Sequence, residues 1–273
     1  MAVIHALWLR NLKAFVRNKT ALIFNLAFPF FFVFVFSGIF GSASMMLAGI
    51  IIATVFDSSL RISSNTIDDM TSGFMKEVLV SPISRLTIAL GQFASSATVA
   101  TVQGLLIYVI GFFMGLRPQS VWTVVFTILS MIFVGLVFAG FGLLIASKAK
   151  NMQTFQAVSM AITMPMTFIS GAYIPLASLP VVLQWVGRFN PMTYAVHFFR
   201  ELTLDIRDDH TAALLSSEQG ILQFWGFNIT PAVSMLILAV FGAVFLFLST
   251  ITFTRVDFSK MNRNKMDAVD MWE

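Results

Sequence analysis

The amino-acid sequence predicts an all-α, polytopic membrane protein with six transmembrane helices. Of its 273 residues, 58% are hydrophobic and 11% are charged, and the mean hydropathy is +0.86. A soluble domain of ordinary composition has about 25% charged residues. So much apolar surface cannot be hidden from water in one core, and the solvent is therefore lipid. The charged residues cluster between uncharged windows at 20–56, 86–116, 118–147, 151–187 and 219–254.

The lengths of these windows set the number of helices. One span needs roughly 20 residues, because each residue adds about 1.5 Å against a hydrocarbon core of about 30 Å. The first window is too long for one helix, and Gly38, Gly41 and Ser42 near its middle favour a tight hairpin. Within a single transmembrane domain, 1–273, the predicted spans are 21–40, 45–64, 88–115, 120–146, 152–174 and 231–253.

The basic residues predict the orientation. With the N-terminus in the cytosol, thirteen of the 17 Lys and Arg residues are cytosolic, and the outer four are Arg117, Arg188, Arg200 and Arg207. The positive-inside rule therefore predicts that both termini are cytosolic in a plasma (cytoplasmic, inner) membrane. A seven-span alternative, with 151–187 divided in two, would put the basic C-terminal tail outside.

Three segments between or beside the spans have a character of their own. Residues 1–20 predict an interfacial amphipathic helix, although a basic flank that only obeys the positive-inside rule is the alternative. Its apolar face carries Ile4, Trp8, Leu12 and Phe15, opposite Arg10, Lys13 and Arg17. Residues 65–85 form the longest internal cytosolic loop, in which Asp68, Asp69, Thr71 and Ser72 are candidate caps of a short helix. The outer segment 175–229 is too apolar for a solvated loop and predicts short re-entrant helices before the last span.

Catalytic and metal-binding patterns are missing from the sequence. It has no G-x-x-x-x-G-K-[ST] motif for nucleotide phosphates and no cysteine. His5, His197 and His210 are isolated, and each is expected in an interface or a loop rather than as a ligand. We therefore predict no catalytic, cofactor or metal site, and the clustered basic residues do not indicate a nucleic-acid partner.

Two patterns within the spans bear on transport. Asp57 and Arg61 lie near the cytosolic end of the second span and are four residues apart, which predicts an ion pair on one helix face whose side chains extend to the interface. Met160, Met164, Met166 and Phe168 surround the kink expected at Pro165, and they suit a lipophilic translocation path and lipid-facing filler equally well. Small residues in spans 3 and 4 favour close packing within one subunit over a dimer seam.

Two stretches resemble a known family. Residues 71–91, TSGFMKEVLVSPISRLTIALG, are similar to the cytosolic loop of type-2 ATP-binding-cassette (ABC) exporter permeases. Residues 171–201, GAYIPLASLPVVLQWVGRFNPMTYAVHFFRE, are similar to the outer segment of that family, where Asn190, Pro191, Tyr194 and Arg200 occupy recurring positions. The subgroup that the chain resembles is the drug-resistance, daunorubicin-type permeases.

The resemblance implies a membrane subunit without its own ATPase site. It implies a second permease protomer, in a homodimer or heterodimer, and two cytosolic ABC ATPase subunits that hold ATP and Mg. Spans 2 and 5 would line the path between the protomers. Residues 68–80 would be the coupling helix, which docks into the ATPase through Gly73, Phe74, Met75, Lys76, Glu77 and Leu79. The expected function is ATP-driven export of a lipophilic drug, lipid or lipid-linked molecule by alternating access. A membrane anchor that recruits a cytosolic partner is the alternative, and a secondary carrier is disfavoured because buried charge is scarce.

Overall fold

A computed structural model describes residues 2–40, 43–71, 84–114, 116, 118, 120–204, 222 and 229–255. Every regular element in these ranges is a helix, which confirms the all-α class. The elements are α1 (Ala2–Arg17), α2 (Lys19–Phe40), α3 (Ala43–Ser63), α4 (Asn65–Thr71), α6 (Arg85–Phe113), α7 (Val121–Lys148), α8 (Met152–Ile169), η1 (Leu176–Ser178), α9 (Val181–Arg188), α10 (Pro191–Thr203) and α12 (Pro231–Arg255).

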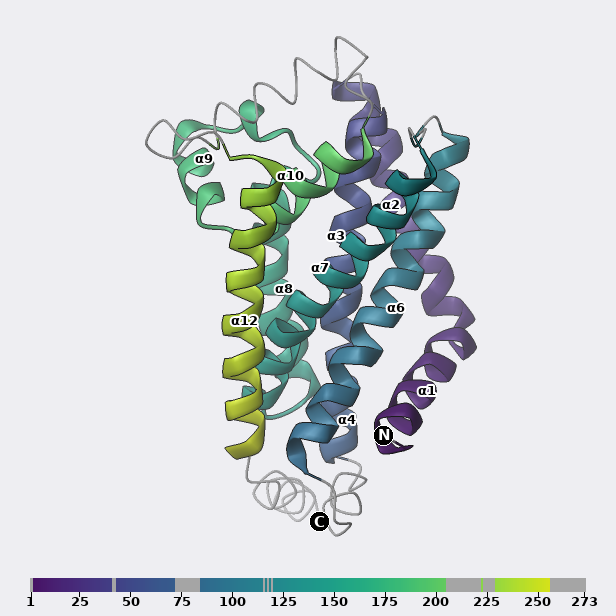
Figure 1. The fold of residues 1–273 in the computed structure, drawn as a ribbon, viewed down its shortest axis with the longest axis vertical. Helices are drawn as coiled ribbons and strands as arrows, with labels where there is room; N and C mark the ends of the chain where they lie inside the picture. Colours follow the sequence, from purple (N-terminus) through teal and green to yellow (C-terminus); the bar gives the residue numbers. More distant parts are fainter. Residues whose placement is uncertain are drawn as a thin grey trace, which may run out of the picture.

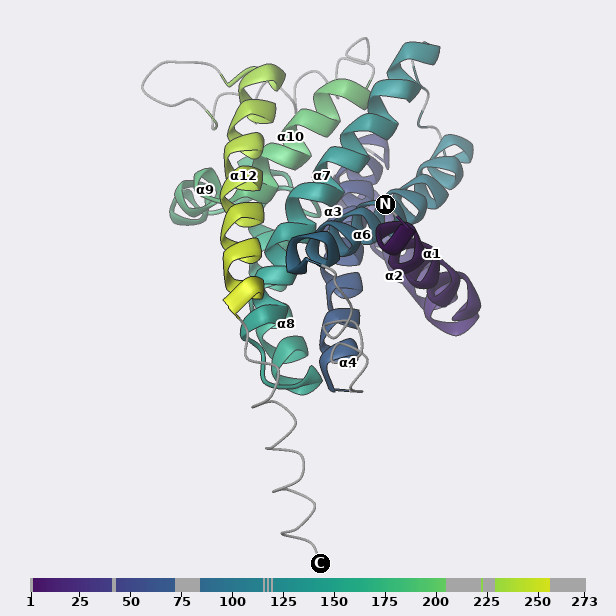
Figure 2. The same cartoon turned by 60° about the horizontal axis from the view of Figure 1, so that its bottom comes forward.

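The long helices form a bundle whose two ends collect different segments. Figure 1 shows α4, the start of α6 and the last turn of α12 at the lower end, near the N-terminus. The upper end holds α9, α10 and the start of α12. In Figure 2, in which the lower end comes forward, α10 and the start of α12 are at the top and α4 is at the bottom. Helices α3, α6 and α7 pack against one another, and α12 packs along α7.

Within the described residues, four helices are long and apolar enough to cross a membrane. They are Ser44–Asp69, Arg85–Phe113, Val121–Lys148 and Pro231–Arg255. A fifth is counted if Trp8–Arg17 and Leu22–Val35, which meet at 72°, form one bent span. Helix α8 has 18 residues and does not belong to these four. The chain therefore has several apolar helices typical of an integral membrane protein, whereas the number six is a proposal.

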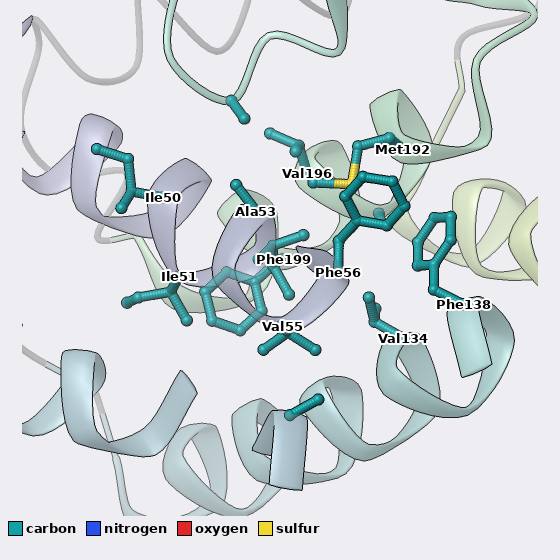
Figure 3. Close-up of a cluster of buried hydrophobic side chains, with 14 of the residues drawn as sticks. Ile50, Ile51, Ala53, Val55, Phe56, Val134, Phe138, Met192, Val196 and Phe199 are labelled. Atoms are coloured by element: carbon teal, nitrogen blue, oxygen red, sulfur yellow. The ribbon is translucent and has the colours of Figure 1, made fainter. Parts of the chain in front are cut away.

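Helix α3 forms the centre of the core. Its residues from Met45 to Phe56 are all buried, because α2, α6, α7 and α10 surround it. The rings of Phe56 and Phe138 meet edge to face with centroids 4.5 Å apart, and Figure 3 shows Met192, Val196 and Phe199 beside them. This arrangement buries the apolar residues of α3, α7 and α10 in one cluster.

Small residues allow these helices to approach closely. A Cβ atom added at Gly135 of α7 would lie 3.1 Å from Cα of Ala97 in α6. One added at Gly142 would lie 2.5 Å from Oγ of Ser63 in α3. Small residues of α6 and α7 therefore allow close packing of helices within the subunit.

The predicted cytosolic loop 65–85 begins later than expected. Residues Asn65–Thr71 are helix α4, which continues the direction of α3 after a single turn residue at Ser64. Asp68 and Asp69 therefore lie inside a helix and do not cap one, which corrects the prediction. The predicted span 152–174 also ends earlier, because α8 stops at Ile169 and Gly171 adopts a left-handed φ of 88°. A glycine at this position is a common helix terminator.

Polar contacts attach α1 to the bundle. The Arg10 guanidinium donates to both oxygens of Asp69 in α4, at 2.8 and 2.6 Å. Asn11 Nδ2 donates to Gln92 Oε1 of α6 at 3.1 Å, and Trp8 Nε1 donates to Thr98 Oγ1 at 2.9 Å. Arg10 was expected on the outward polar face, so its ion pair within the protein is a second correction.

Candidate functional site

Helices α2, α3 and α8 enclose a groove of about 430 Å³, called here the aromatic groove. Helix α2 brings aromatic rings to it, α3 brings the two charged side chains, and α8 closes it. The lining residues are Phe24, Asn25, Phe28, Pro29, Phe32, Ala53, Thr54, Asp57, Arg61, Met160, Thr163, Met164, Thr167, Phe168 and Tyr173.

Ring contacts join the two sides of this groove. Phe32 of α2 stacks on Tyr173, which follows α8, with centroids 4.7 Å apart. Phe28 meets Phe32 at 4.7 Å, and Phe168 meets Tyr173 at 5.3 Å. The groove therefore has a continuous aromatic wall that accepts an apolar molecule.

Three of the four predicted path residues lie in the groove. Met160 and Met164 are 63% and 52% exposed, and Phe168 lies on the same face of α8. All three also border an adjoining apolar depression of about 520 Å³ with Ala157 and Pro165. Met166 lies elsewhere, in a depression of about 310 Å³ against α9 and α10. The structure therefore brings Met160, Met164 and Phe168 together and separates Met166 from them.

The predicted pair of Asp57 and Arg61 is confirmed within the groove. Arg61 Nη2 lies 3.1 Å from Asp57 Oδ2, and Arg61 Nη1 donates to Asn25 Oδ1 of α2 at 2.6 Å. The Asp57 and Arg61 side chains are 52% and 45% exposed. A charge in the middle of a membrane helix costs roughly 2.5–3.5 kcal/mol. This cost favours a wet or ligand-filled groove over hydrocarbon beside the pair.

A second, polar cavity begins at the same residues. It has a volume of about 240 Å³ and lies between α1, α2, α3, α4 and α6. Its lining is richer in polar side chains than that of the aromatic groove, with Asn11, Asn18, Ser58, Asn65 and Gln103 beside the apolar Ala14, Phe15, Leu22, Ile62 and Val99. Asn25 and Arg61 border both this polar cavity and the aromatic groove. The Asn25–Arg61 contact therefore stands where a polar compartment meets an apolar one.

The residues of the outer motif hold α8, α9 and α10 together. Asn190 caps α10 by accepting from Met192 N at 3.0 Å, and Pro191 follows at the first helical position. The Asn190 amide also donates to Met166 O of α8 at 2.6 Å, and the Tyr194 hydroxyl donates to Arg188 O. These contacts fix the turn between α9 and α10 against the end of α8.

Arg200 joins this outer segment to the core. It is fully buried and donates from Nη2 to Gly171 O at 2.7 Å and from Nε to Met45 O at 3.3 Å. Gly49 of α3 lies beside it, and a Cβ atom there would be 2.8 Å from Arg200 Nη2 and would collide with Ala172 O. Arg200 thus binds one carbonyl just after α8 and one at the start of α3. Both helices line the aromatic groove.

His197 lies inside the protein and not in a loop, which corrects the prediction. It is 2% exposed in α10, and its Nδ1 lies 3.0 Å from Ser234 Oγ of α12. Burial, with the positive charge of Arg200 as second cause, lowers the pKa of His197 from 6.5 to about 4. The ring is therefore neutral at neutral pH, and its 3.8 Å approach to Glu201 is not an ion pair. No group of three or more His, Asp or Glu side chains in the described ranges is placed to hold a metal.

The predicted coupling residues fall in the segment 72–83, outside the described residues. They are Gly73, Phe74, Met75, Lys76, Glu77 and Leu79. Helix α4 leads into this segment and α6 begins soon after it, at the lower end of the bundle in Figure 1.

Sequence reasoning missed the contribution of α2 to the groove. Phe24, Phe28 and Phe32 recur at intervals of four residues, and Asn25 is the one uncharged polar side chain between Thr20 and Ser37. That spacing places them on one helix face and was an available signal. It was hidden because nearly every other side chain of α2 is also apolar.

Comparison with known proteins decides the family. A model of the ABC-2 type transporter family matches residues 2–204, which is most of the chain. The chain belongs to this family. As an ABC-2 type permease it is the membrane component of a transporter, and the ATPase that it works with is a separate ABC subunit.

Named relatives of this permease agree with the family. It is 28% identical over 243 residues to the transport permease ycf38 of Cyanophora paradoxa, covering 84% of this chain and 81% of the relative. It is 24% identical over 213 residues to nodulation protein J of Rhizobium leguminosarum bv. viciae, covering 73% and 81%. It is 28% identical over 134 residues to the inner membrane transport permease YadH of Escherichia coli strain K12, covering 49% and 52%.

Proposed function

We propose that this permease is half of an ATP-driven exporter that moves a lipophilic molecule outward across the plasma membrane by alternating access. Two protomers, identical or different, and two cytosolic ABC ATPases that hold ATP and Mg make up the complex. Six spans with both termini in the cytosol complete the proposal. The observation that carries it is the aromatic groove, where Met160, Met164 and Phe168 of α8 face the rings of α2.

The packing of α8 supports its role as the moving wall. Only Phe155 and Thr167 of α8 are buried, whereas α3 is buried along most of its length. Interactions with the bundle are therefore few, and changing them costs less than moving α3. The methionine side chains of α8 are flexible and adapt to substrates of different shape. A drug or a lipid suits such a wall better than a strongly ionic solute.

The segment 72–83 is proposed to transmit the force of ATP binding. Phe74 is the proposed anchor in an apolar pocket of the ATPase, with Lys76 and Glu77 at its rim. The location is favoured because the segment joins α4 to α6 at the end of the bundle opposite α10.

The test reconstitutes the permease with its ATPase partner in proteoliposomes and follows lipophilic substrate uptake together with ATP hydrolysis. Met164→Trp is expected to lower transport about tenfold, the effect of a modest misfit in an apolar pocket, without loss of ATPase assembly. Phe74→Ala is expected to weaken assembly or to uncouple hydrolysis from transport. Met235→Trp is the matched control, because Met235 of α12 is 47% exposed but lies outside the groove. Equal transport by the Met164 and Met235 variants would show that the substrate does not pass through the aromatic groove.

A further inference from the structure

A path for purely apolar molecules does not explain why the aromatic groove contains the charged pair Asp57–Arg61. In the proposed span 45–64, Asp57 stands twelve residues after the first residue and seven before the last. It therefore lies about two helical turns inside the lower end of the span, and yet its side chain keeps about half of its surface exposed. A charged pair within a membrane span is rare and is by default a sign of function.

The pair stands at a boundary between polar and apolar surfaces. On one side, Asn25 and Arg61 border the polar cavity with Asn18, Asn65 and Gln103. On the other side, the aromatic groove continues with Phe28, Phe32 and Tyr173. A molecule that satisfies both sides has a polar head at the pair and an apolar body along the rings.

The opposite charges of Asp57 and Arg61 limit which type of ligand head group can bind there. Asp57 and Arg61 neutralise each other across 3.1 Å, so the pair is a dipole with no net charge. An anionic or a cationic head would satisfy one partner and leave the other facing a like charge. A zwitterionic head places its cation on Asp57 and its anion on Arg61, and both charges stay paired.

We propose that the aromatic groove binds a single-chain zwitterionic amphiphile, with its head group on the Asp57–Arg61 pair and its chain against the rings of α2 and α8. The volume of about 430 Å³ fits one drug-sized molecule or one chain. This substrate class rests on the proposed transport through the groove. Its test uses binding to the permease alone, so that failure of binding and failure of transport are separate observations.

The binding experiment uses purified permease in a nonionic maltoside detergent. Native mass spectrometry counts the bound probe, with palmitoyl lysophosphatidylcholine as the zwitterion, palmitoyl lysophosphatidylglycerol as the anion and hexadecyltrimethylammonium as the cation. The wild-type chain is expected to prefer the zwitterion over either single charge by about fivefold, which is the upper end of the effect of one ion pair at an open site. A photoreactive lysophosphatidylcholine is expected to label peptides from α2 and α8.

Four variants test whether the Asp57–Arg61 pair sets the preference among the zwitterionic, anionic and cationic probes. Asp57→Asn leaves Arg61 alone and is expected to shift the preference to the anionic probe, whereas Arg61→Gln shifts it to the cation. The double exchange Asp57→Arg with Arg61→Asp restores a neutral pair and is expected to restore the zwitterion preference. Arg17→Gln removes an exposed charge of α1 and controls for unspecific attraction to head groups; it is expected to change nothing.

Three outcomes would overturn the proposal. One is a selectivity that stays the same in both single-charge variants. Another is photolabelling spread over the exposed face of α12. The third is a groove closed by a second copy of the chain, which gives cross-linked protomers between α2 and α8 and no bound probe.

Discussion

Single residues of the outer motif have tasks that the sequence does not reveal. The resemblance marked Asn190, Tyr194 and Arg200 as recurring, but gave no partners for them. Arg200 donates to Met45 O, 155 residues away, and to Gly171 O, 29 residues away. Backbone carbonyls carry no side-chain signature, so such contacts cannot be predicted from residue spacing. The need for glycine at position 49 is equally hidden, because it arises from the backbone at Ala172.

The buried guanidinium of Arg200 is expected to be needed for full stability. Arg200→Lys keeps the positive charge but replaces a planar fork by a single ammonium group, which cannot reach both carbonyls in the same geometry. Because hydrogen bonds to charged groups contribute about 1.5–3 kcal/mol each, we expect a clearly lower thermal midpoint in detergent. Scanning fluorimetry measures it. Arg17→Lys, the same exchange at an exposed site of α1, is the control and is expected to match the wild type. Equal midpoints for both variants would contradict the role of Arg200.

Whole elements were predicted better than their ends. The long helices α6, α7 and α12 lie over the predicted segments 88–115, 120–146 and 231–253 because their apolar runs are long and bounded by charge. The polar helix α4 was missed because hydropathy carries no signal for it. Its Asp69 is 8% exposed and is paired with Arg10 of α1, a tertiary contact that hydropathy does not reveal.

The second prediction concerns this connection between α1 and α4. Asp69→Asn and Arg10→Gln each remove a bidentate, charge-assisted contact, and each is expected to cost about 1.5–3 kcal/mol of stability. The double variant is expected to cost little more than either single one, because both remove the same interaction. Thermal midpoints of all four proteins give the coupling. Lys13→Gln, on the exposed side of α1, is the control. Additive losses would show that Arg10 and Asp69 contribute independently.

At the scale of the whole molecule, the apolar windows predicted an all-helical bundle. The basic clusters predicted which loops lie on the cytosolic side. Two predicted spans, α2 and α8, are not among the four long apolar helices of the described residues, and both differ from these four in physical ways. Helix α2 contains Pro29 and meets α1 at a sharp bend, and α8 is short and rich in Met and Thr. The groove itself could be predicted only in part, because α8 is visible as a methionine-rich segment while its pairing with α2 requires the fold. One labelling experiment can therefore test two things: which end of the bundle faces the cytosol, and whether α2 and α8 cross the membrane.

The last prediction tests these crossings with single cysteines, which is direct because the chain has no cysteine of its own. An impermeant maleimide applied to intact cells is expected to label cysteines at Gly38, Ser120 and Ser178, which lie at the upper end of the bundle. Cysteines at Lys19, Ser84 and Lys150, on the predicted cytosolic side, are expected to react only after the membrane is opened. All six residues are exposed in the monomer, so a missing reaction reflects the membrane and not burial in the chain. The pair Lys150 and Ser178 brackets α8, and the pair Lys19 and Gly38 brackets α2. Labelling of both members of a pair from outside would show that the helix between them does not cross, and a reversed pattern at Ser84 and Ser120 would invert the positive-inside orientation.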